Sequence, residues 1–119
     1  MAVVHVTREN FEQLLQDHAM IVLDFWAPWC GPCRTYGPIF EDVSDGHPDV
    51  LFGKINTDEQ QELAGAFGIQ SIPSTVFFRE RVALHLQPGV MPRPGLEDMI
   101  RQMREIDMEQ VRAEMATQA

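Results

Sequence analysis

The sequence predicts an α/β fold: a central mixed β-sheet of about five strands flanked by about four helices, in three layers, α/β/α. Short runs of branched and aromatic residues alternate with segments of helical periodicity, and two late runs follow each other without a helix between them. The length of 119 residues and the 45% hydrophobic content suit one domain. We assign residues 1–107 to this domain and residues 108–119 to a C-terminal tail or helix extension.

The first half of the chain predicts two strands, each followed by a helix. Residues 3–6 favour a short strand, and Thr7 is suited to cap the helix that follows. Residues 21–26 read as a buried central strand because nearly all of them are bulky and apolar. A helix is expected from Pro32 to about Ser44, and Pro38 should kink it because proline removes a helical hydrogen bond.

The second half predicts one more strand–helix unit and then a hairpin. Residues 50–55 form the expected strand, and Asp58 is placed to cap a short helix. After Pro73, residues 75–78 and 82–86 are expected to pair as a hairpin, although the turn between them lacks a glycine.

The last predicted helix starts near Leu96. Its apolar stripe ends at Ile106, and Glu97 with Arg101 supplies an i,i+4 ion pair. Beyond Asp107 the apolar stripe is thin, with Met108, Val111 and Met115. This segment could extend the helix, dock on the domain or fray, and a frayed tail is the default expectation.

Charge and hydropathy exclude several classes of function. The formal net charge is −9 and lysines and arginines are not clustered, which argues against a nucleic-acid partner. The longest apolar run, residues 19–23, is too short to cross a membrane, and the first basic residue, Arg8, follows the opening apolar residues, unlike in a signal peptide. We expect a soluble, cytoplasmic protein that is a monomer and has no membrane partner.

The two cysteines of the chain, Cys30 and Cys33, are separated by two residues, which indicates local redox chemistry rather than a disulfide scaffold. Cys30 lies where a helix begins, so unpaired backbone N–H groups and the helix dipole favour its thiolate. We expect Cys30 to be the accessible nucleophile. Cys33, one turn further along, is expected to be a shielded resolving thiol.

The segment from Asp24 to Arg34, with the sequence DFWAPWCGPCR, resembles the active-site segment of the thioredoxin family. The resemblance extends over roughly residues 2–106 and includes Lys54-Ile55-Asn56, residues 68–74 and a late glycine. It implies the thioredoxin fold and a thiol–disulfide oxidoreductase that reduces protein disulfides. It also implies a redox-active disulfide with no bound cofactor, and two kinds of partner: disulfide-containing proteins and thioredoxin reductase, an NADPH-dependent flavoenzyme.

The resemblance also implies roles for individual residues. Asp24 matches a buried carboxylate that helps remove the proton of the resolving thiol, and Lys54 matches a lysine near it. From the residues alone, Asp24 could equally be a carboxylate at the edge of the core, and Lys54 a surface charge at a strand end. Ile72-Pro73 matches a cis-proline loop that faces the cysteines. A surface for target proteins is implied at Trp29, Gly31, Pro32, Ile72, Pro73 and Gly89.

Three alternatives to a disulfide reductase remain open. The first is a zinc site, for which the chain offers no second cysteine pair and four widely scattered histidines. The second is a disulfide oxidant or isomerase on the same fold, although Gly31-Pro32 between the cysteines resembles the reducing members of the family. The third is a binding or chaperone module with a dedicated partner.

Overall fold

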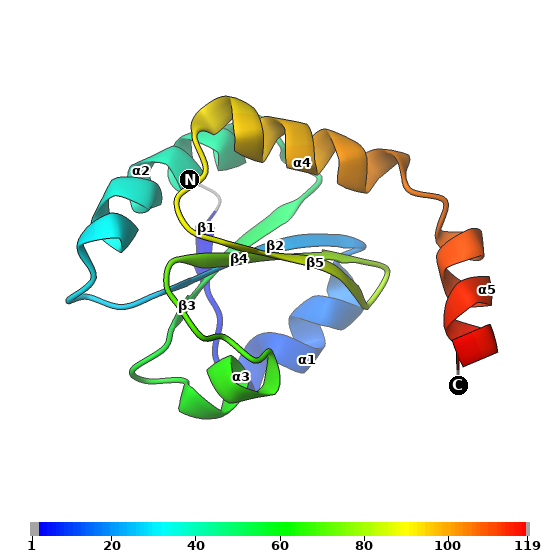
Figure 1. The fold of residues 1–119 in the computed structure, drawn as a ribbon, viewed down its shortest axis with the longest axis horizontal. Coiled ribbons are helices and arrows are strands. Elements are labelled where there is room, and N and C mark those ends of the chain that lie inside the picture. The colour runs from blue at the N-terminus through cyan, green and yellow to red at the C-terminus, as the bar shows by residue number, and fades with distance from the viewer. Residues whose placement is uncertain (1–2, 119) are drawn as a thin grey trace.

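The computed structural model describes residues 3–118 and has one five-stranded sheet covered by helices on both faces (Figure 1). The strands are β1 (Val3–His5), β2 (Met20–Trp26), β3 (Leu51–Asn56), β4 (Ser74–Arg79) and β5 (Val82–Pro88). The helices are α1 (Arg8–Asp17), α2 (Gly31–Asp45), α3 (Gln61–Ala66), α4 (Arg93–Glu105) and α5 (Met108–Gln118). The predicted α/β class and the strand count are confirmed, and one more helix is present than the sequence suggested.

The sheet is mixed, as predicted, with the strand order β1-β3-β2-β4-β5. Strand β3 pairs in parallel with β1 and with β2, whereas β4 pairs antiparallel with β2 and with β5. The C-terminal end of the central strand β2 leads directly into the segment that carries both cysteines. The cysteines therefore lie at one edge of the sheet, beside the start of α2.

Two apolar cores lie on opposite faces of the sheet. Helices α2 and α4 cover one face, where Phe40 and Ile100 pack with Phe52 of β3. Helices α1 and α3 cover the other face, where Leu15 packs in the same cluster as Phe25 of β2. Because β2 is buried on both faces, it reads as a nearly continuous hydrophobic run.

The predicted N-cap residue is confirmed for α1 and wrong for α3. Thr7 is the N-cap of α1, and its backbone N–H donates to Asn10 Oδ1 at 2.8 Å. The prediction that Asp58 caps the next short helix is wrong, because Gln60 occupies that position in α3. Helix α2 continues through Pro38 to Asp45.

The hairpin turn forms without glycine. Arg79 pairs with Val82, so Glu80 and Arg81 alone make the turn, and their φ angles are 51° and 70°. Positive φ at both central residues is the geometry that matches the twist of paired strands, and it is strained for residues other than glycine.

The C-terminal residues form a separate helix instead of the expected frayed tail. Ile106 and Asp107 separate α4 from α5, which projects away from the sheet (Figure 1). Met108 at its start is buried, and Arg112 donates to Glu80 Oε1 of the hairpin turn at 2.7 Å. These contacts connect α5 to the body of the protein.

The predicted ion pair between Glu97 and Arg101 is also wrong. Arg101 instead pairs with Asp98 at 2.7 Å and with Glu105 at 3.0 Å. The Glu97 carboxylate lies 2.6 Å from Nε2 of His47, which precedes β3. The segment between α2 and β3 lies against α4, so His47 reaches the Glu97 carboxylate and Arg101 of the same helix pairs elsewhere.

Candidate active site at the start of helix α2

The two cysteines form a disulfide at the N-terminus of α2. Cys30 is the N-cap residue and Cys33 lies in the first turn, with 5.2 Å between their Cα atoms. The backbone N–H of Cys33 donates to Cys30 Sγ at 3.2 Å. This contact places the positive end of the helix dipole and a hydrogen-bond donor at the Cys30 sulfur, as the sequence predicted.

Both cysteine residues are equally buried in this oxidised form, each 4% exposed. The expected difference, an accessible Cys30 and a shielded Cys33, is therefore absent: the two sulfurs are bonded to each other, and Trp26 and Ile72 pack against the cluster that contains both residues. The two still differ in position. Cys30 lies outside the helix with its Sγ 3.7 Å from the Ile72 carbonyl oxygen, whereas Cys33 lies on the buried side of the helix.

Two loops meet beside the disulfide. The Ile72–Pro73 peptide bond is cis, as the resemblance implied. The Gly89 N–H donates to the Pro73 carbonyl at 2.8 Å, which connects the loop after β5 to the loop before β4. Gly89 has a φ of 88°, a conformation that glycine adopts without steric cost.

The surface next to the disulfide carries an exposed aromatic side chain. Trp29 is 67% exposed, and its indole Nε1–H donates to the Asp58 carboxylate at 3.0 Å. Gly31 and Pro32, in the first turn of α2, are exposed as well. The structure thus gathers the predicted surface residues around the cysteines, although Pro73 itself is buried. Asp58, expected to cap a helix, orients the indole.

Asp24 is a fully buried carboxylate in the middle of the sheet. Neither of its carboxylate oxygens has a hydrogen-bond partner among the described residues. Burial raises the pKa of Asp24 from 3.8 to about 7, and the charge of Lys54 partly opposes that increase. A group that titrates near neutral pH can accept or release a proton under ordinary conditions.

Lys54 lies directly beside Asp24, because the two are partners in the parallel register of β2 and β3. Its Nζ lies 4.9 Å from the centroid of the Trp26 ring, within cation–π range. A Cβ added at Gly37 would come 3.5 Å from Nζ, so the lysine extends beneath α2. Lys54 is half-buried, which does not fit a free surface charge.

Comparisons with known proteins agree with this geometry. Residues 2–102 match the family model described as Thioredoxin. A protein named putative thioredoxin 2 from Streptomyces coelicolor is 48% identical over 115 residues, which cover 97% of this chain and 86% of that protein. The chain belongs to the thioredoxin family.

Solved structures of other thioredoxins have the same fold. A mutant thioredoxin from Halobacterium salinarum superimposes with a TM-score of 0.81 at 28% identity, covering 88% of this chain and 93% of that one. The thioredoxin from Malassezia sympodialis gives a TM-score of 0.77 at 34% identity, with 87% and 94% covered. As a thioredoxin, the chain is a thiol–disulfide oxidoreductase that reduces protein disulfides, and Cys30–Cys33 is its redox pair.

Sequence reasoning missed three polar residues near this thioredoxin site. Asp58 was assigned to a cap, whereas Tyr36 and Thr75 received no role. Tyr36 and Thr75 are both buried, and the Tyr36 hydroxyl oxygen lies 2.8 Å from Thr75 Oγ1. Their contact spans 39 positions of the chain, so only the register of the sheet and the packing of α2 reveal it.

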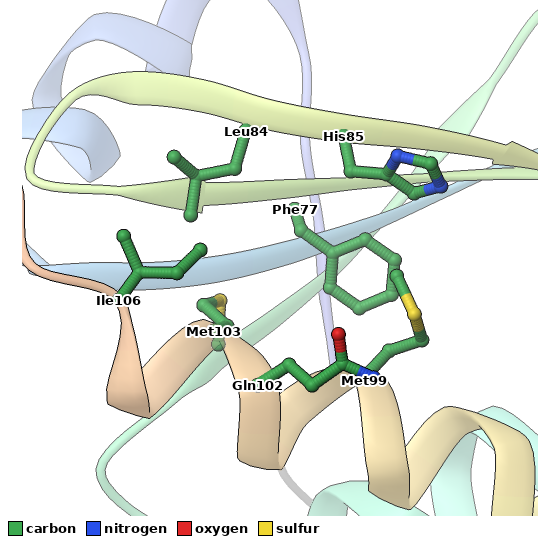
Figure 2. A pocket seen from close by; sticks show the side chains of 7 residues that line it. All are labelled: Phe77, Leu84, His85, Met99, Gln102, Met103 and Ile106. Carbon is green, nitrogen blue, oxygen red and sulfur yellow. The ribbon is translucent and has the colours of Figure 1, made fainter. Parts of the chain in front are cut away.

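An apolar cavity of about 260 Å³ lies away from the thioredoxin disulfide, between the hairpin and α4 (Figure 2). Leu84 and Phe77 line it from the strands, and Met99 and Ile106 line it from α4 and the residues after it. None of its lining residues belongs to the cysteine site.

Within residues 3–118, no group of three or more His, Cys, Asp or Glu side chains is arranged to hold a metal ion. In the same range, no helix has the length and apolar character needed to cross a membrane.

Proposed function

We propose that Cys30 is the attacking thiolate of this thioredoxin and Cys33 the resolving thiol. The observation that carries the assignment is the position of Cys30 as the N-cap of α2, with its Sγ accepting the Cys33 N–H at 3.2 Å. In the reduced protein the same donor and the helix dipole favour a negative charge on the Cys30 sulfur. Cys33 lies on the buried side of the helix, so we expect foreign disulfides to reach the outer residue Cys30 first once the pair is reduced.

The reaction then runs in two exchanges. The Cys30 thiolate attacks one sulfur of a target disulfide, a mixed disulfide forms, and the other target sulfur leaves with the electron pair. The Cys33 sulfur next attacks Cys30 Sγ, so the mixed disulfide breaks and the second target thiolate is released. The target gains two electrons and the Cys30–Cys33 disulfide returns.

Asp24 is proposed to take the proton of Cys33 during the second exchange. Its buried position and its pKa of about 7 support this role, because a base is most effective when it titrates near the working pH. Lys54 is proposed to keep Asp24 from becoming too weak an acid, since its charge opposes the effect of burial. Both assignments concern proton movement and involve no contact with the target.

Target proteins are proposed to bind across the surface formed by Trp29, Gly31, Pro32, Ile72, Pro73 and Gly89. Support comes from the exposed indole and from the Ile72 carbonyl, which lies 3.7 Å from Cys30 Sγ. An extended target segment can pair its backbone with this loop, as in other cases of strand addition. The specificity then comes from the side chains around the disulfide.

We further propose that electrons reach the disulfide from NADPH through thioredoxin reductase, so the chain needs no bound cofactor of its own. The proposed setting is the cytoplasm, where a dithiol pair can be kept reduced. A monomer suffices for this cycle, because Cys30 and Cys33 lie on one chain. Cell fractionation and size-exclusion chromatography test the location and the state of assembly.

The deciding experiment is insulin reduction coupled to thioredoxin reductase and NADPH. Cys30→Ser should abolish turnover, and Cys33→Ser should accumulate a covalent adduct with the target. The matched control is Ser44→Ala, which removes a buried hydroxyl from the same helix and should leave turnover unchanged. Full activity of Cys30→Ser, or no adduct with Cys33→Ser, would contradict the assignment of the two thiols.

The same preparation separates a reductant from an oxidant on this fold. A reduction potential of about −270 mV is expected for a reductase, and a value of about −120 mV would indicate an oxidant instead. The measurement requires only equilibration with glutathione or dithiothreitol. A potential at the oxidising end would overturn the proposed direction of electron flow and leave the exchange chemistry intact.

A further inference from the structure

A row of three polar residues crosses the otherwise apolar centre of the sheet. Asp24 of β2 is the register partner of Lys54 in β3 and of Thr75 in β4. Directly paired residues of neighbouring strands place their side chains on the same face. Asp24 therefore has a cation on one side and a hydroxyl on the other.

Helix α2 covers this row with one of its faces. Cys33, Tyr36 and Gly37 are buried and separated by three and four positions, so they lie on the same side of the helix. Gly37 lies over the end of Lys54, since a Cβ there would come 3.5 Å from Nζ. Tyr36 lies over Thr75, with 2.8 Å between the two hydroxyl oxygens.

Tyr36 is the single tyrosine of the chain and is fully buried, as is Thr75. Two buried hydroxyls share one contact, and either oxygen can be the donor. When the tyrosine donates, the hydrogen of Thr75 is free to point along the sheet toward Asp24. Such a dipole stabilises a nearby negative charge strongly in an apolar interior, even beyond hydrogen-bond distance.

We propose that Tyr36 is a positioning residue of this thioredoxin: its phenol donates to Thr75 and thereby turns the Thr75 hydroxyl dipole toward Asp24 when that carboxylate is charged. The pair thus compensates in part for the missing hydrogen bonds of Asp24. Asp24 then has a second source of compensation, on the side opposite Lys54.

The protonation of the surrounding groups is consistent with this arrangement. Lys54 from β3 and Tyr36 from α2 are the groups whose charges couple to Asp24, with Cys33 on the same face of α2. Burial raises the pKa of Tyr36 above its ordinary value, the hydrogen bond with Thr75 opposes part of this increase, and the charge of Asp24 adds to it. The phenol therefore keeps its proton throughout the range in which Asp24 titrates and remains able to donate.

The first test measures the titration of Asp24 in the oxidised full chain, by carboxyl carbon NMR. Tyr36→Phe removes only the phenol oxygen and should raise the pKa of Asp24 by about half a unit to one unit, because the Thr75 hydroxyl dipole that favours the charged form is no longer held toward Asp24. Thr75→Val keeps the volume, removes the dipole itself and should raise it by at least as much.

Two further variants make the test specific. In the Thr75→Val background, Tyr36→Phe should add nothing, because the phenol acts through the threonine. Ser44→Ala removes another buried hydroxyl of α2, one that donates to the Glu41 carbonyl, and should leave the titration of Asp24 unchanged. An unchanged or lowered pKa in Tyr36→Phe, or additive effects of Tyr36→Phe and Thr75→Val, would overturn the proposal.

A kinetic measurement separates this inference from the proposed function on which its catalytic meaning rests. Reduced protein mixed with the disulfide of 5-thio-2-nitrobenzoate releases one coloured thiolate when Cys30 attacks and a second when Cys33 resolves the mixed disulfide. In Tyr36→Phe, the pH midpoint of the second release should rise together with the pKa of Asp24. If the pKa rises and the midpoint stays, the hydroxyl pair stands and the proposed role of Asp24 as proton acceptor is refuted.

Discussion

Replacing Asp24 with asparagine should change how stability depends on pH. Burial raises the pKa of this carboxyl from 3.8 to about 7, so the folded chain keeps the proton at pH values where the unfolded chain has lost it. The contribution of Asp24 to stability therefore falls as the pH rises from about 4 to about 7 and levels off above that range. The pKa of Asp24 differs by about three units between the folded and the unfolded chain, and this difference destabilises the folded protein by about 4 kcal/mol at pH 8.

Asp24→Asn removes this titration, because an amide stays neutral. The buried amide N–H groups of the introduced asparagine will lack hydrogen-bond partners, which lowers stability by about 1–3 kcal/mol. The variant should therefore be more stable than the wild type by about 1–3 kcal/mol at pH 8, and no more stable at pH 4. For a chain of 119 residues this gain corresponds to an increase in melting temperature of about 4 °C per kcal/mol.

The assay is urea unfolding of the oxidised proteins between pH 4 and pH 8.5. The matched control is Asp42→Asn, the same chemical change at an exposed residue that pairs with Arg93. This control should keep the pH slope of the wild type. A stability difference between Asp24→Asn and the wild type that stays constant from pH 4 to pH 8 would refute the reasoning.

Three other substitutions test the surroundings of the site and the hairpin. Lys54→Met should raise the pKa of Asp24 above about 7, because it removes the charge that opposes burial; carboxyl NMR measures it, and no change would mean that the two groups are uncoupled. Asp58→Asn should weaken the hydrogen bond to Trp29, lower kcat/KM for insulin by about two- to tenfold and red-shift the indole emission. Unchanged kinetics would show that this hydrogen bond is not needed for activity. Arg81→Gly should raise stability in urea by about 1 kcal/mol, because glycine adopts positive φ without strain; a loss of stability would contradict strain at this turn.

Local sequence signals predicted most of the fold. Alternating strand and helix patterns gave the three-layer α/β class, and the pair Cys30 and Cys33 gave the chemistry, because both depend on residues close together in the chain. The cis bond before Pro73 was predicted only through resemblance to a family, since nothing in the local sequence distinguishes it from a trans bond.

Errors arose where a residue had more than one possible partner. Asp58 was suited to cap a helix, yet the Trp29 indole reaches it across 29 positions of the chain. Glu97 was suited to pair along its own helix, yet His47 lies closer to its carboxylate. The type of a side chain determines which groups it can bind, whereas the packing of the fold determines which of these groups lies within reach.

Local composition and periodicity are enough to predict the order of the elements, the cysteine pair at a helix start and the apolar faces that form the two cores. The neighbours of Asp24, in contrast, depend on the folded structure. Lys54 and Thr75 lie beside it because of the strand register, and the phenol of Tyr36 lies above Thr75 because α2 packs on this face of the sheet. Electrostatic interactions depend on the distance between groups, and for residues far apart in the chain this distance is set only when strands and helices pack together.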